Sequence, residues 1–287
     1  MTAEPERIAA LALAEDGDRD VTSALTIPAG LEAEGVIEYR SGGVLAGAAF
    51  ADAVARACEC RIAWSAPDGR LLPAGATAGV INGPLSLILR AERPMLNLLQ
   101  RACGIATLTR AYVDAVAGLP CRILHTRKTA PGLRTLDIAA VIAGGGARHR
   151  TDLSHEVMVK DNHWQALERN GGDLARALDD ARALGIAALY VEVESRSEVE
   201  EACRARATRL LVDNQTPATL REWGTVAREL RPGIEIEATG GITLENVRAY
   251  AEAGADFISV GALTHSVRAA DLALEIRTAR ASLAPRP

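Results

Sequence analysis

The feature that most constrains this fold is a regular alternation of short apolar segments and alanine-rich helical segments over residues 122–260. The apolar segments have the length of buried strands and lie at 122–125, 156–160, 189–194, 209–213, 234–238 and 257–260. Helical spacing separates most of them, as at 173–185, 197–207 and 243–254. This rhythm predicts parallel strands joined by right-handed crossovers. Six or seven such units favour a β/α barrel over an open sheet.

A different pattern precedes the barrel region. Residues 6–15 have helical spacing, and residues 34–89 consist of short apolar runs separated by glycine turns, with 86–90 interpreted as the last strand. Residues 91–118 then return to helical spacing behind Pro94, a residue favoured in the first turn of a helix. The sequence therefore predicts a small mixed α/β unit, followed by a long helix that leads into the barrel.

The composition excludes several classes of protein. Hydrophobic residues make up 48% and charged residues 24%, as in an ordinary globular protein, so a core can be buried. The net charge of −5 and the lack of a lysine and arginine block argue against a nucleic-acid partner. Neither a signal-peptide pattern nor an apolar run of membrane-spanning length is found, so we expect a cytoplasmic protein without a membrane partner.

The five cysteines have no spacing typical of a zinc site or a redox motif. Cys58 and Cys60 flank a single residue, but no second pair of ligands follows them. We therefore expect all five to be reduced, mostly structural thiols.

Charged side chains follow the predicted strands at their carboxyl ends, where β/α barrels carry their chemistry. Each one alone is unremarkable, because strand ends meet water and are commonly polar. The stronger signal is that charged residues follow successive strands, so all of them would lie at one end of the barrel, its mouth. Four cations and a histidine would there lie opposite two carboxylates: Arg127, Lys128, His149, Arg150 and Lys160 opposite Glu192 and Asp213. The cations suit a substrate with several negative charges, and the carboxylates suit Mg²⁺ or sugar hydroxyls.

The last two predicted strands end in glycine. Thr239 is followed by Gly240 and Gly241, and Gly261 precedes a segment that contains His265. Glycine at a strand end exposes backbone N–H groups, and a following helix start adds a positive end, so together they suit a phosphate. We therefore expect a phosphorylated, ribose-like ligand at this part of the mouth.

Eight motifs in this order resemble the quinolinate phosphoribosyltransferase family, the carboxylating nicotinate-nucleotide pyrophosphorylases of NAD biosynthesis. They are ERPMLNLLQRACGIATLT, TRKTAPGLR, GGGARHR, VMVKDNH, EVE, LLVDN, ATGGIT and SVGALTHSV. The resemblance implies an N-terminal α/β sandwich over residues 1–108, an open seven-stranded β/α barrel over 109–271 and a C-terminal segment, 272–287, that packs back on the sandwich. It also implies a homodimer whose active site is shared between chains.

The resemblance further implies that quinolinate and phosphoribosyl pyrophosphate react with Mg²⁺ to give nicotinate mononucleotide, pyrophosphate and CO₂. Carboxylate binding would fall to Thr126, Arg127, His149, Arg150 and Lys160, with Arg93 from the partner chain. Lys128 would contact the pyrophosphate, and Glu192 and Asp213 the ribose hydroxyls and metal. The 5′-phosphate region would be Thr239, Gly240, Gly241, Gly261 and His265.

Some positions differ from the family pattern: His125 replaces an aspartate, Arg148 an asparagine and Thr239 a serine, while Ile138 and Ile142 replace basic or polar residues. These differences are compatible with a transferase for another heteroaromatic carboxylate. A protein of the ModD type, associated with molybdate uptake, would have a similar sequence, but the intact ERPMLNLL and KDNH segments disfavour it. A non-catalytic phosphosugar-binding barrel is disfavoured because Lys128 and both carboxylates are retained.

Overall fold

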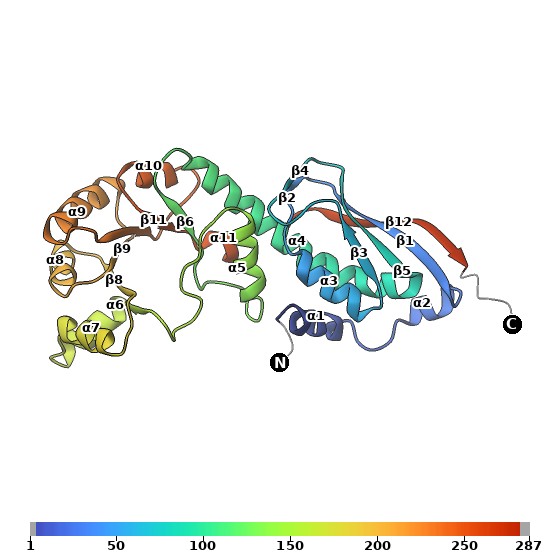
Figure 1. Cartoon of the computed structure of the whole chain (residues 1–287), viewed down its shortest axis with the longest axis horizontal. Coiled ribbons are helices and arrows are strands. Elements are labelled where there is room, and N and C mark those ends of the chain that lie inside the picture. Colours follow the sequence, from blue (N-terminus) through green and yellow to red (C-terminus); the bar gives the residue numbers. More distant parts are fainter. Residues whose placement is uncertain (1–3, 282–287) are drawn as a thin grey trace. The chain divides into compact units, whose positions relative to one another are not determined.

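The computed structural model describes residues 4–281, which form two compact units (Figure 1). The first unit contains the described residues up to Arg110, residues 129–145 and the described residues from Ala262 onward. The second contains residues 111–128 and 146–261. The compact units divide the chain first between Arg110 and Ala111, and the domain boundary between residues 108 and 109 stays a prediction.

The first unit is built on an antiparallel sheet in the order β12-β1-β5-β3. The bounds of these strands are Leu272–Ala281, Leu31–Tyr39, Ala76–Pro84 and Arg61–Trp64. A small second sheet pairs β2 (Gly43–Val44) with β4 (Leu71–Leu72). The helices are α1 (Glu4–Glu15), α2 (Val21–Thr26), α3 (Ala48–Ala57), α5 (Arg134–Ala143), α11 (Ala262–His265) and most of α4 (Leu85–Ala115).

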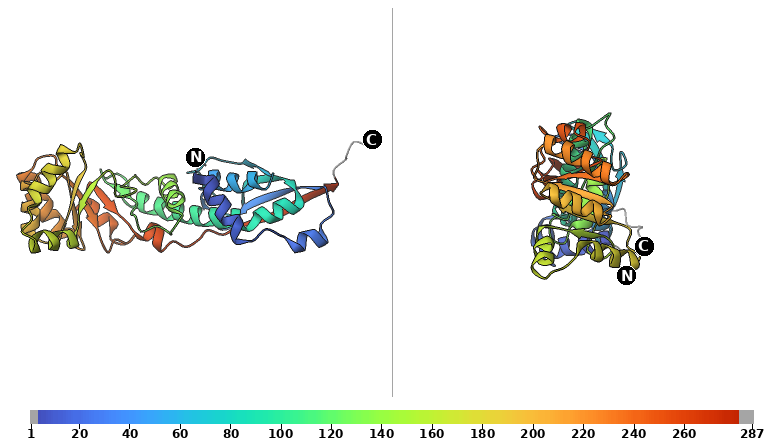
Figure 2. Two further views of the ribbon diagram at one scale, coloured as in Figure 1. Left: turned by 90° about the horizontal axis from the view of Figure 1, so that it is seen from below. Right: turned by 90° about the vertical axis from the view of Figure 1, so that its left-hand side faces the viewer.

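Strand β12 joins the two ends of the sequence within the first unit. It pairs antiparallel with the whole of β1, from Leu31 opposite Ala281 to Tyr39 opposite Leu272. Figure 1 and the left panel of Figure 2 show the red end of the chain running beside the blue strand. Residues 272–281 therefore pair with the N-terminal sheet, and residues 282–287 lie outside the described residues.

Helix α4 corrects one sequence prediction. Residues 86–90 are not a strand, because α4 begins at Leu85 and contains Pro94 in its interior. Leu85, Ile88, Ala91 and Met95 are all buried, and their spacing places them on one helical face. Burial along this face favours the helix, whereas a half-buried strand would need alternating exposure.

The second unit is a parallel sheet in the order β6-β11-β10-β9-β8-β7, which confirms the predicted fold class. Its strands match the six predicted segments: β6 (Arg122–Leu124), β7 (Val157–Val159), β8 (Leu189–Val193), β9 (Arg209–Asp213), β10 (Glu235–Thr239) and β11 (Phe257–Ser259). Ala147 makes one parallel bridge with Leu124 in β6. Among the described residues, the parallel sheet therefore has six strands, and this bridge adds a single residue beside β6.

Three crossover helices of the second unit, α7, α8 and α9, begin at residues whose side chains cap them. Asp173 accepts a hydrogen bond from Ala175 N, Ser195 forms a capping box with Glu198, and Thr216 precedes Pro217. Helices α8 and α9 lie side by side against the sheet (Figures 1 and 2). The helices are α6 (Asp161–Arg169), α7 (Leu174–Ala183), α8 (Arg196–Arg204), α9 (Pro217–Leu230) and α10 (Val247–Glu252).

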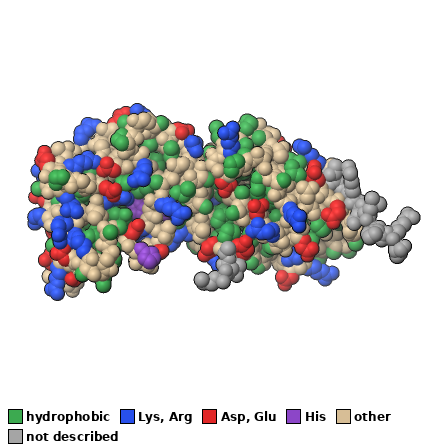
Figure 3. Space-filling model, in the orientation of Figure 1, with side chains coloured by type: hydrophobic (Ala, Val, Ile, Leu, Met, Phe, Trp, Pro, Cys, Tyr) green, Lys and Arg blue, Asp and Glu red, His purple; other side chains and the backbone are tan. Residues whose placement is uncertain are grey.

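The surface has no basic block on the face drawn in Figure 3, where cationic and acidic side chains are interspersed. Among the described residues, no helix combines the length and the apolar character that crossing a bilayer requires.

Candidate active site

A cavity of about 570 Å³ opens at the carboxyl ends of the parallel strands in the second unit. Its lining includes most of the residues singled out from the sequence, namely Thr126, Arg127, Lys128, His149, Arg150, Lys160, Glu192, Asp213, Thr239, Gly240 and Gly241. Parallel strands bring their carboxyl ends to one edge, so residues from six separate strand ends meet.

Three predicted site residues do not line this cavity. Arg93 is exposed on α4 and His265 is exposed at the end of α11, both in the first unit. His265 Nδ1 lies 2.6 Å from Ser266 Oγ. Gly261 follows β11 as the last residue of the second unit.

Arg127 and Arg150 make one side of the cavity strongly cationic. Arg127 Nε is buried without a hydrogen-bond partner among the described residues. Burial lowers the pKa of Arg150, and the charge of Arg127 lowers it further. Two like charges held partly out of water are unfavourable, because each is desolvated and the two repel each other. An anion bound between them would offset both the desolvation and the repulsion.

Lys160 lies at the start of α6, directly after β7. Its backbone N–H donates to His163 Nδ1 at 3.1 Å, and Trp164 Nε1 donates to the carbonyl oxygen of Glu192 at 2.8 Å. The first bond closes the start of α6, and the second holds α6 against β8. Lys160 Nζ forms an ion pair with the buried carboxylate of Glu192. A carboxylate ligand of Lys160 would therefore compete with Glu192.

Acidic residues also line the cavity. Glu194 follows β8 and Asp213 ends β9. Glu194 is exposed, but slight desolvation raises its pKa, and repulsion from Asp213, Glu198, Glu192 and Asp161 raises it further. Such mutual repulsion means that a cation or several hydroxyl donors would be bound favourably here.

Gly240 and Gly241 have different structural reasons to be glycine, although both have positive φ, at 78° and 61°. A Cβ on Gly240 would lie 2.3 Å from Asn214 Oδ1 and 2.8 Å from Asn214 N. A Cβ on Gly241 would meet nothing within 4 Å. Gly240 thus allows Asn214 to pack closely, while Gly241 leaves open space above the backbone. Helix α11 begins directly after Gly261, but α10 begins only at Val247, several residues past Gly241.

Hydrogen bonds in the structure define the tautomers of two histidines. The Arg150 N–H donates to His149 Nδ1 at 2.6 Å, so the ring proton of neutral His149 is on Nε2, 3.2 Å from Glu237 Oε2. The His149 N–H donates to His125 Nε2 at 3.0 Å, which leaves the proton of His125 on Nδ1, beside the Thr126 carbonyl. His125 is fully buried, and burial is the main cause that lowers its pKa.

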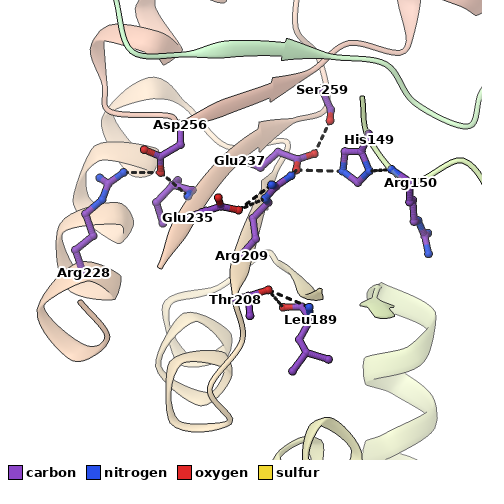
Figure 4. Close-up of polar contacts among 11 residues, drawn as sticks. His149, Arg150, Leu189, Thr208, Arg209, Arg228, Glu235, Glu237, Asp256 and Ser259 are labelled. Atoms are coloured by element: carbon purple, nitrogen blue, oxygen red, sulfur yellow. Dashed lines mark hydrogen bonds and ion pairs between the residues drawn. The ribbon is translucent and has the colours of Figure 1, made fainter. Parts of the chain in front are cut away.

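The floor of the cavity contains a charged network that the sequence analysis missed (Figure 4). Glu237 in β10 has a side chain only 1% exposed, accepts from His149 and Ser259, and pairs with Arg209 at 3.0 Å. Burial alone would raise the pKa of Glu237, but these donors outweigh burial and lower it. The available signal was the alternation in IEIEA, which places Glu235 and Glu237 on the same face of one strand.

Fold and site together define a class of protein: a β/α barrel whose strand ends form a cavity lined by both cationic and carboxylate side chains. The sequence matches the family description Quinolinate phosphoribosyl transferase, N-terminal domain over residues 20–103 and C-terminal domain over residues 105–275. The chain belongs to the quinolinate phosphoribosyl transferase family.

Individual relatives agree with this assignment. The chain is 39% identical to the chloroplastic nicotinate-nucleotide pyrophosphorylase [carboxylating] of Arabidopsis thaliana, over 93% of this chain and 81% of that protein. It is 38% identical to the Mycobacterium leprae protein of the same name, over 90% and 91%. Its structure is similar to the nicotinate-nucleotide pyrophosphorylase of Francisella tularensis, with a TM-score of 0.88, 31% identity and coverage of 96% and 98%.

Proposed function

We propose that this chain transfers the phosphoribosyl group of phosphoribosyl pyrophosphate to quinolinate, with loss of CO₂, to give nicotinate mononucleotide and pyrophosphate. Membership of the family supports this reaction. The observation that carries the proposal is the charge of the cavity lining, which combines Arg127, Arg150 and Lys160 with Glu194 and Asp213. The cations, here called the cationic wall, suit a dicarboxylate, and the carboxylates, the acidic wall, suit ribose hydroxyls and a metal.

The dicarboxylate would bind at the cationic wall. The partnerless Nε of Arg127 and the disfavoured charge of Arg150 both gain from a carboxylate. The ion pair of Lys160 with Glu192 would be replaced by a pair of Lys160 with a substrate carboxylate. The Glu192 carboxylate would then be available to bind the ribose. Both ring nitrogens of His149 have partners: Nδ1 lies 2.6 Å from the Arg150 backbone nitrogen and Nε2 lies 3.2 Å from Glu237 Oε2. We therefore propose that His149 orients Arg150 in addition to lining the site.

The phosphoribosyl group would lie over the acidic wall and the glycines. We assign Lys128 to the pyrophosphate, Glu192 and Asp213 to the ribose hydroxyls, and Thr239, Gly240 and Gly241 to the 5′-phosphate. The open space above Gly241 supports this last assignment, because a phosphate can approach its backbone without a Cβ in the way. Gly261 and His265 are proposed for the same phosphate by family resemblance.

A magnesium ion fits the acidic wall. Among the described side chains, no three or more His, Cys, Asp or Glu residues form a ready-made metal site. Mg²⁺ commonly binds through one or two carboxylates and substrate phosphates, and Glu192 and Asp213 offer such a pair, with Glu194 also in the cavity lining. When bound, Mg²⁺ would neutralise charge on the pyrophosphate.

The reaction needs positioning and charge stabilisation from these residues. The bond from ribose C1 to pyrophosphate breaks, and the quinolinate ring nitrogen supplies the electron pair for the new bond to C1. Lys128 would stabilise the negative charge that builds on the leaving group. The bond between ring C2 and its carboxylate then breaks, its electrons remain at C2 beside the cationic nitrogen, CO₂ leaves and a proton adds to C2. Arg127 and Arg150 would hold the acid in the required orientation.

The direct test is pyrophosphate release when the enzyme is mixed with Mg²⁺, phosphoribosyl pyrophosphate and quinolinate, with nicotinate mononucleotide identified by mass spectrometry. Nicotinate, which lacks one carboxylate, should be a poor substrate, because one unmatched buried charge costs about 2–5 kcal/mol. Comparable turnover of both acids would contradict the proposed substrate. Release that depends on another heteroaromatic carboxylate would favour a different acceptor for the same transfer.

We also propose a homodimer in which Arg93 completes the partner's active site. Arg93 is exposed on α4 of the first unit, and the family resemblance supports its role at the site of a second chain. Arg93→Ala and Lys128→Ala should each be nearly inactive alone. If they are unfolded, mixed equally and refolded, half the dimers are mixed and each has one intact site, so activity should recover to about a quarter of wild type. Activity that stays at the level of the separate variants would remove Arg93 from the partner's site.

A cytoplasmic location is also proposed. The five cysteines are all buried free thiols, which suits a reducing compartment. Cell fractionation followed by immunodetection tests this, and enrichment in an organelle or a secreted fraction would contradict it.

A further inference from the structure

The network beneath His149 has a role that the proposed reaction does not by itself assign. Glu237 lines the cavity, but its carboxylate is already occupied: Oε2 accepts from His149 and Arg209, and Oε1 accepts from Ser259. Three of the roughly four acceptor sites of a carboxylate are thus taken by donors of this chain. The contact of Glu237 that leads to the cationic residues of the cavity is the one with His149.

His149 connects Glu237 to the cationic wall. Its Nδ1 can accept the Arg150 N–H, at 2.6 Å, only while the ring proton is on Nε2. The other neutral tautomer, or a doubly protonated ring, would place two donors against each other and open the turn at Arg150. Glu237 accepts from Nε2 at 3.2 Å and so favours the one tautomer that this turn requires.

Arg209 holds Glu237 and its surroundings in place. Its guanidinium pairs with Glu237 at 3.0 Å and with Glu235 at 2.7 Å, and it stacks 3.8 Å from the centre of the Phe257 ring. It also stacks on Tyr190, whose ring meets His149 edge to face with centroids 5.7 Å apart. Figure 4 shows the chain of contacts from Arg209 through Glu237 to His149 and Arg150.

We propose that Glu237 is a positioning residue that holds His149 in its Nε2–H tautomer and thereby fixes Arg150 for the acid substrate. The substrate named here rests on the proposed function. The role differs from that of Glu192 and Asp213, because Glu237 acts through His149 and not on the reacting groups.

The test compares three variants. Glu237→Leu removes the acceptor while Glu235 still pairs with Arg209, and it should raise the KM for quinolinate about tenfold, the loss of one hydrogen bond to a charged group. The KM for phosphoribosyl pyrophosphate and kcat should stay within about twofold of wild type. Glu237→Gln retains a carbonyl acceptor and should restore most of the quinolinate affinity.

The matched control is Glu235→Leu, which removes a carboxylate from the same strand and from the same arginine but does not touch His149. It should leave both KM values near wild type. An equal rise in the KM for quinolinate in Glu235→Leu and Glu237→Leu would overturn the proposal, since it would show that Arg209 alone decides the effect. If Glu237→Leu raised the KM for phosphoribosyl pyrophosphate as much as the KM for quinolinate, the proposal would also be overturned, because the whole active site would then be disturbed.

Nitrogen-15 NMR of histidine-labelled wild-type protein gives a readout without activity. The His149 signal, assigned with His149→Gln, should show a protonated Nε2 and an unprotonated Nδ1. A protonated Nδ1 in the wild type overturns the proposal even if Glu237→Leu does not fold. If wild type shows the expected tautomer but does not use quinolinate, the proposed substrate fails and the histidine geometry stands.

Discussion

Replacing the two neighbouring glycines after β10 separates a packing requirement from a ligand requirement. Both residues have positive φ, so alanine at either position costs about 1–2 kcal/mol of backbone strain. Gly240→Ala also places a methyl group 2.3 Å from Asn214 Oδ1 and 2.8 Å from Asn214 N, closer than packed atoms approach. Such overpacking adds about 1–3 kcal/mol, so the total loss of unfolding free energy should be about 2–5 kcal/mol.

Gly241→Ala is the matched control, because its methyl group enters open space and only the strain of about 1–2 kcal/mol remains. Its effect should instead fall on binding: if the 5′-phosphate lies over this backbone, the KM for phosphoribosyl pyrophosphate should rise at least tenfold, with the KM for quinolinate little changed.

Urea unfolding and initial-rate kinetics of both variants provide the comparison. Equal losses of unfolding free energy would refute the packing argument for Asn214 and Gly240. An unchanged KM for phosphoribosyl pyrophosphate in Gly241→Ala would refute the assignment of the phosphate to this backbone.

Three further predictions follow from the site. Lys160→Ala should weaken quinolinate binding while phosphoribosyl pyrophosphate binding, measured by calorimetry, stays nearly intact; an equal loss of both would show that the pair with Glu192 serves both substrates. Asp213→Asn should lower activity and change the magnesium dependence with a near-normal melting temperature, whereas loss of stability at unchanged specific activity would make Asp213 structural. Burial lowers the pKa of His125, so below about pH 6.5 the unfolded chain takes up a proton that the native state resists, and stability should fall by up to about 1.4 kcal/mol per pH unit. Urea unfolding between pH 5 and 8 checks this, and His125→Asn should show a shallower fall.

The parallel strands were the most predictable part of the fold, because their signal is local. Each apolar segment from 122 to 260 is followed by a polar residue or glycine, and all six became strands in the predicted places. Residues 86–90 show the limit of a local signal. A short apolar run fits a strand and a helix equally well, and only the burial of Leu85, Ile88 and Ala91 against the rest of the unit favours α4.

Most of the candidate site could be predicted because barrel topology converts order in the sequence into position in space. Knowing that Lys160, Glu192 and Asp213 each stand at a strand end is enough to bring them to one cavity. Strand order does not place Arg93, which lies in the other unit, and its proposed function needs a second chain.

The buried network could not be predicted for a different reason. The alternation in β10 indicates that Glu235 and Glu237 share a face, but a charged residue in a strand is normally assigned to the solvent side. The inward placement of Glu237 is acceptable only because Arg209, two strand positions away on the neighbouring β9, supplies a buried countercharge. That pairing depends on the register of two strands and on the aromatic rings that hold the guanidinium, none of which is encoded locally. The same dependence explains why the network suits positioning: a carboxylate fixed by three donors holds one orientation, and so does the histidine that it contacts.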